Sequence, residues 1–120
     1  MFNLLFDKAI PKQLGQLRPA NTSSAALYTL ATRTQVLVTT IVICNTTGSA
    51  TTFSIYNDTD GSTYSEATAL CFDYPIGANE SIAWEIENGI PIIEVGGTLG
   101  VKSGSSNALN FTAYGLERKT

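Results

Sequence analysis

Residues 35–45 read QVLVTTIVICN and form the strongest strand signal in the chain. This stretch is dense in β-branched residues, which favour extended structure, and it is short for a helix. It lacks a clean alternation over its full length, which is typical of a strand covered on both faces. The pattern therefore predicts a central strand.

The segments that flank this strand alternate more clearly. Residues 45–49 (NTTGS) predict a turn, and residues 51–57 follow with Phe53 and Ile55 on one face, so the two segments predict a hairpin. Residues 81–87 show the cleanest period of two, with Ile82, Trp84 and Ile86 on one face. Such alternation predicts a strand with one buried and one wet face.

Shorter strand signals occupy most of the remaining chain. Asn88-Gly89 predicts a turn between residues 81–87 and a short strand at 90–95, which Pro91 limits. The other predicted strands cover residues 14–18, 27–30, 67–73, 98–102 and 108–117. About eight short strands, with turns roughly every ten residues, predict an all-β fold: a two-sheet antiparallel β-sandwich of jelly-roll or immunoglobulin-like topology.

The alternation also predicts which side chains form the core. Trp84 is the single tryptophan and lies on the best amphipathic strand, so Trp84→Ala is expected to cost about 3–5 kcal/mol. The predicted core consists of Val36, Val38, Ile41, Ile43, Phe53, Ile55, Leu70, Phe72, Ile82, Trp84, Leu99, Val101, Leu109 and Phe111.

Composition narrows the class of function. The chain has 120 residues, a hydrophobic share of 43%, a charged share of 14% and a net charge of −3. Its seven basic residues are scattered, which argues against nucleic-acid binding. No apolar run approaches the ~18 residues of a membrane-spanning helix, and the first residues lack the features of a signal peptide. Low charge with abundant Thr, Ser and Asn suits surfaces that meet other proteins.

The residue types needed for common catalytic sites are missing or poorly placed. No histidine is present, which removes Ser-His-Asp and Cys-His catalysis and the commonest metal ligand. Glu85 and Glu87 share the wet face of one strand and are expected to be solubilising charges. Cys44 and Cys71 are expected to be free thiols in apolar surroundings, while a disulfide stays open. We therefore expect no enzymatic activity, no cofactor and no metal.

The segment Asn57-Asp58-Thr59-Asp60-Gly61 resembles part of a calcium loop. Its first and twelfth positions would be Tyr56 and Ala67, which cannot supply the oxygen ligands that such a loop needs. The pattern favours a turn held by Asp side chains, and a weak cation site stays open.

Residues 1–12 stand apart from the sandwich predicted for residues 13–120. They carry Phe2, Leu4, Leu5 and Phe6, and Pro11 closes the segment. An N-terminal arm that binds a partner is one interpretation, because exposed apolar side chains mark partner sites. The other is that the domain buries these side chains itself.

Several runs of residues carry a resemblance to a known family. They are residues 39–56 (TTIVICNTTGSATTFSIY), 60–64 (DGSTY) and 107–112 (NALNFT), with shorter matches at Leu14-Gly15-Gln16, Leu27-Tyr28, Ala69-Leu70, Pro75-Ile76, Gly97-Thr98-Leu99 and Tyr114-Gly115. Over residues 13–117 the chain resembles small β-sandwich structural proteins of tailed-bacteriophage virions. The matching residues are core and turn residues, so the resemblance transfers no active site.

The resemblance implies a virion protein, made in the host cytoplasm and then assembled on the particle. It fits a capsid cement or decoration protein that binds the major capsid protein and copies of itself as a homo-oligomer, with a trimer as the simplest guess. The alternative is a tail or surface accessory protein that binds a host glycan or receptor. Its candidate ligand-facing residues are Tyr56, Tyr64 and Tyr74, although packing is favoured for the five tyrosines as a group.

Overall fold

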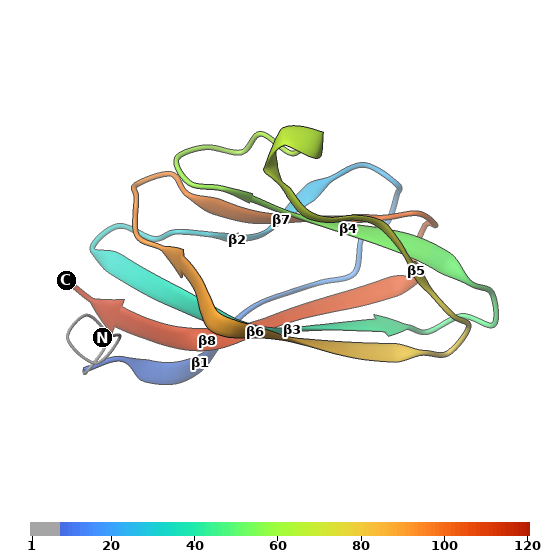
Figure 1. Cartoon of the computed structure of the whole chain (residues 1–120), viewed down its shortest axis with the longest axis horizontal. Coiled ribbons are helices and arrows are strands. Elements are labelled where there is room, and N and C mark those ends of the chain that lie inside the picture. Colours follow the sequence, from blue (N-terminus) through green and yellow to red (C-terminus); the bar gives the residue numbers. More distant parts are fainter. Residues whose placement is uncertain (1–7) are drawn as a thin grey trace.

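A computed structural model describes residues 8–120 of the chain (Figure 1). These residues form eight strands and one short 3-10 helix. The elements are β1 (Ile10–Leu17), β2 (Ala25–Thr29), β3 (Thr34–Asn45), β4 (Thr51–Asp58), η1 (Glu66–Thr68), β5 (Ala69–Ile76), β6 (Ser81–Ile92), β7 (Thr98–Ser103) and β8 (Leu109–Lys119).

The strands form two antiparallel four-stranded sheets that pack face to face (Figure 1). One sheet has the order β1-β8-β3-β6 and the other β2-β7-β4-β5. Successive strands alternate between the sheets for most of the chain, which is the double Greek-key arrangement of an eight-stranded jelly roll. The predicted β-sandwich is confirmed, and of the two topologies left open the strand order selects the jelly roll over the immunoglobulin fold.

The segment that decides the fold, β3, lies at the centre of its sheet. It pairs with β8 on one side and β6 on the other over nearly its whole length. Its inward side chains Val36, Val38, Ile41 and Ile43 are fully buried. Its outward side chains from Thr39 onward are mostly half-buried, so the strand is central as predicted but is not fully covered on both faces.

The core lies between the two sheets and includes most of the predicted residues. Ile82 and Trp84 pack against it but are half-buried, because β6 is the last strand of its sheet. The prediction is wrong for Leu70 and Phe72, which are 44% and 45% exposed. Cys71 pairs with the fully buried Ile55 and therefore faces inward, which turns its larger neighbours outward.

The predicted turn at Asn88-Gly89 is also wrong, because β6 continues through it to Ile92. Asn88 and Gly89 both have positive φ, 65° and 73°. Val38 pairs with Ile90, whereas Thr40 already pairs with Glu85, so residues 86–89 bulge out opposite Thr39. A bulge lets one long strand bend without ending, and the two segments predicted separately are one strand.

The N-terminal boundary also moves. β1 begins at Ile10, whose register partner is Glu117 on β8, so residues 10–12 belong to the sheet rather than to the arm. The four apolar residues assigned to the arm, Phe2, Leu4, Leu5 and Phe6, lie outside the described residues.

Candidate binding surface

An apolar groove of about 430 Å³ lies on the side of the sandwich where β5 and β6 are the outermost strands. Ile82, Ala83 and Trp84 of β6 form one wall, and the other wall comes from β5, with Phe53 of β4 behind it. The β5 side chains that line it are Leu70, Cys71, Phe72 and Tyr74.

The groove exposes several large apolar side chains together. Leu70 and Phe72 are nearly half exposed, and Tyr74 is 53% exposed. The rings of Tyr74 and Phe53 have centroids 5.7 Å apart, and Phe53 in turn meets Phe111 at 6.3 Å. Aromatic packing therefore runs from the centre of the core to the surface, and the exposed apolar side chains are grouped rather than scattered, which makes the groove the candidate binding surface.

The two strands beside the groove differ in how well their edges can accept another strand. β5 is irregular: its register against β4 shifts twice, Asp73 has a φ of 49°, and Pro75 lacks an amide proton. The backbone N–H of Asp73 donates to Ser54 Oγ at 2.9 Å, which holds this bend. β6 alternates cleanly from Ser81 to Glu87 and, within residues 8–120, pairs only with β3. Its outer edge is therefore the better template for strand addition.

The structure separates the three tyrosines proposed as ligand-facing. Tyr56 is only 2% exposed, so it is not a ligand-facing residue. Tyr64 is half-buried and lies over Gly100, with its ring 5.7 Å from that of Tyr56. Together they pack the connection between β4 and β5 onto the outer face of the sheet. Tyr74 is the one of the three with a freely exposed ring, and it belongs to the groove.

The segment that resembles a calcium loop is a turn stabilised by its own carboxylate. Asp58 Oδ2 accepts a hydrogen bond from the Thr63 amide at 2.7 Å, and Asp58 Oδ1 accepts one from the Asp60 amide at 3.4 Å. The bonds from Thr63 and then Asp60 lower the pKa of the Asp58 carboxyl. The predicted turn is confirmed. Within residues 8–120, no group of three or more His, Cys, Asp or Glu side chains is placed to hold a metal ion.

Both cysteines are free and lie on different sheets, Cys44 on β3 and Cys71 on β5. Cys71 lines the groove and packs against the core. Partial burial raises the pKa of its thiol. Cys44 is half-buried on the opposite sheet and is not part of the groove.

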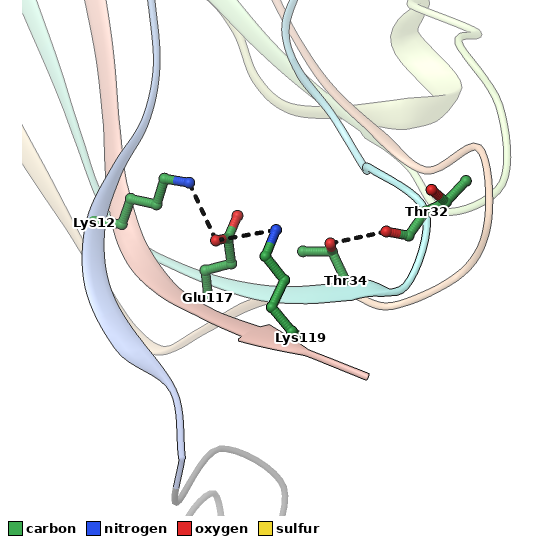
Figure 2. A network of polar contacts seen from close by, with 5 residues as sticks. All are labelled: Lys12, Thr32, Thr34, Glu117 and Lys119. Atoms are coloured by element: carbon green, nitrogen blue, oxygen red, sulfur yellow. Dashed lines mark hydrogen bonds and ion pairs between the residues drawn. The ribbon is translucent and has the colours of Figure 1, made fainter.

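The acidic residues of β6 and β8 differ in their burial and contacts. Glu85 and Glu87 are exposed on the outer face of β6, as predicted. Sequence reasoning missed Glu117, whose side chain is 7% exposed and meets Lys12 Nζ at 3.1 Å and Lys119 Nζ at 3.6 Å (Figure 2). The contact with Lys12 ties the start of β1 to β8.

No protein-family model matches the chain, and no curated protein matches it. One similar solved chain belongs to the structure of infectious bursal disease virus, Gx strain, with a TM-score of 0.48 and 13% identity over 93% of this chain and 32% of that chain. Another belongs to the Gt strain of the same virus, with a TM-score of 0.39 and 11% identity over 93% of this chain and 33% of that one. This chain thus spans about a third of their length, and likeness at this level transfers no function.

No helix among residues 8–120 is long and apolar enough to cross a membrane.

Proposed function

We propose that this chain is a non-enzymatic structural protein of a virus particle, specifically a capsid cement or decoration protein of a tailed phage. The observation that carries the proposal is a jelly-roll sandwich with an exposed aromatic groove along one open side. A surface of this kind buries apolar area against another protein.

Three further features support this function. Jelly rolls recur in viral capsid domains, although a fold alone does not determine function. A charged share of 14% suits broad polar contacts between proteins. The sequence resembles structural proteins of phage virions over residues 13–117, and these residues supply the sandwich.

In the proposed mechanism the protein works as a homo-oligomer, such as a trimer, that binds neighbouring major capsid proteins. The N-terminal arm with Phe2, Leu4, Leu5 and Phe6 supplies partner-binding side chains. Several weak contacts made by one oligomer on one shell add up through multivalency, so each contact need not be tight. The protein stabilises the shell by linking subunits and needs neither cofactor nor chemistry.

The test is reconstitution on capsids that lack the protein. Purified full-length chain is mixed with such capsids, bound copies are counted after sedimentation, and the temperature at which the capsids rupture is measured. Saturable binding with a raised rupture temperature is expected. Capsids that remain bare at saturating protein, or bind it with no gain in heat resistance, contradict the cement function.

Exposed Tyr74 and Phe72 favour one second candidate, a tail or surface accessory protein that binds a host-surface glycan. Jelly rolls also occur in lectins, and exposed aromatic rings stack on sugar faces. Calorimetric titration with host-surface polysaccharide tests it. Binding that Tyr74→Ala abolishes favours this function, whereas no measurable heat with any host polysaccharide removes it.

A further inference from the structure

We infer that the groove between β5 and β6 receives residues 2–6 of a second copy of this chain, added as a strand along the outer edge of β6. The inference rests on the proposed partner-binding role of the arm and deepens it, because it names both the occupant and the receiving surface.

The side-chain pattern of the arm matches the chemistry of the groove. Phe2, Leu4 and Phe6 recur at every second position, with Asn3 and Leu5 between them. An extended segment therefore presents these three apolar side chains on one face, about 7 Å apart. The groove offers Phe72, Tyr74 and Trp84 as partners over an apolar floor. Two phenylalanines packing among aromatic rings gain both apolar burial and ring contacts.

The edge of β6 supplies the backbone part of the site. A strand beside Ser81–Glu87 forms main-chain hydrogen bonds to groups that have no partner strand among the residues that the structure describes. It also turns alternate side chains toward the gap between the sheets, where Ile82 and Trp84 already point. The bent and bulged β5 offers no comparable run.

The occupant comes from a second copy because the chain's own arm is too short. Ile10 pairs with Glu117 and through it with Val36, whereas Trp84 pairs with Ile41. Ile10 and Trp84 are thus three strands apart and about five residues apart along the sheet, roughly 20 Å in all. The four residue steps from Phe6 to Ile10 reach at most about 14 Å.

Figure 1 shows the same separation, with the start of β1 at one end of the sandwich and the start of β6 at the other. The contact therefore joins two different surfaces of the molecule. Such a head-to-tail contact either closes into a ring or continues as a chain. A closed ring of three copies is consistent with the trimer proposed above.

The experiment compares the full-length protein with arm variants by sedimentation equilibrium. The wild type is expected to self-associate reversibly. Phe2→Ser combined with Phe6→Ser removes two buried rings and is expected to weaken association at least about 100-fold. Leu5→Ser, on the other face of the arm, is the matched control and is expected to retain most of the affinity. Thermal melting checks that all variants keep the folded sandwich.

The two cysteines locate the arm in the groove. A maleimide reagent is expected to label Cys71 more slowly in the assembled wild type than in the Phe2→Ser/Phe6→Ser variant, while Cys44 labels at the same rate in both. A monomeric wild type, an equal effect of Leu5→Ser, or unchanged Cys71 labelling overturns the inference.

Capsid binding distinguishes this inference from the proposed function. Monomeric wild-type protein that still binds capsids overturns the self-docking and leaves the cement function standing. Protein that forms the ring but does not bind capsids overturns the cement function and leaves the self-docking standing.

Discussion

The two lateral sides of the sandwich, where the outermost strands of the sheets lie, differ in how closely the sheets meet. Where β1 and β2 are the outermost strands, the sheets meet tightly: a Cβ at Gly15 would overlap the carbonyl oxygen of Leu27. Where β5 and β6 are outermost, the sheets leave a groove of about 430 Å³ with large exposed side chains. One side closes within the chain, and the other leaves large apolar side chains exposed.

Residue size explains much of this difference. On the closed side, Gly15 lets two backbones touch, and Leu14 and Leu17 reach the core. On the open side, the inward position of β5 opposite Ile55 carries the small residue Cys71, while Leu70 and Phe72 are nearly half exposed. Small residues cannot fill the gap between two sheets about 10 Å apart, so the gap remains as a groove.

The largest expected effect is a difference in stability between a substitution at the centre of the core and one at the groove. Phe111 is fully buried, and Phe111→Ala is expected to cost about 4 kcal/mol of unfolding free energy. Trp84→Ala is expected to cost about 2 kcal/mol, below the 3–5 kcal/mol expected from sequence, because the ring is half-buried at the groove. Chemical denaturation measures both. Equal losses contradict an open groove.

The next largest effect on stability is expected on the side where β1 and β2 are outermost. Gly15→Ala forces the backbones of β1 and β2 apart and is expected to cost about 3 kcal/mol. Gly48→Ala is the matched control, because a Cβ there meets nothing within 4 Å. Thermal melting of both variants is the measurement. A Gly15→Ala protein as stable as Gly48→Ala shows that the two edges do not touch.

The exposed side chains of the groove predict a much smaller effect on stability. Phe72→Ser is expected to change the unfolding free energy by less than about 1 kcal/mol, since the ring is already nearly half in water. Its self-association by sedimentation is expected to fall at least tenfold. A strong loss of stability in Phe72→Ser would show that Phe72 belongs to the core after all.

The smallest effect concerns the loop that leads into β5. The folded-state pKa of Asp58 lies below its unfolded value, so its contribution is present above about pH 4 and is lost as the pH falls through the folded pKa. Carbon-detected NMR titration is expected to place that pKa below 3.8. In Asp58→Asn, the loss of melting temperature below pH 4 is expected to be smaller than in the wild type, and an identical loss contradicts the assignment.

Sequence predicted the fold class because β-branched runs and turn residues report local structure directly. It did not predict which side chains of β5 face the core. Both faces of residues 69–72 are apolar, and only the pairing of Cys71 with Ile55 decides which face turns inward. It missed the continuity of β6, because Asn88-Gly89 signals a turn and a bulge alike. The groove could not be predicted, since it arises where the outermost strands of the two sheets leave a gap between them, and the sequence does not show how the sheets pack.

Hydrogen–deuterium exchange of the free and the self-associated protein tests the central claim, that the β5–β6 side is the docking side. Amides on the outer edge of β6, from Ser81 to Glu87, are expected to gain protection on self-association, while those of β1 stay unchanged. Protection gained along β1, or at neither edge, contradicts the account.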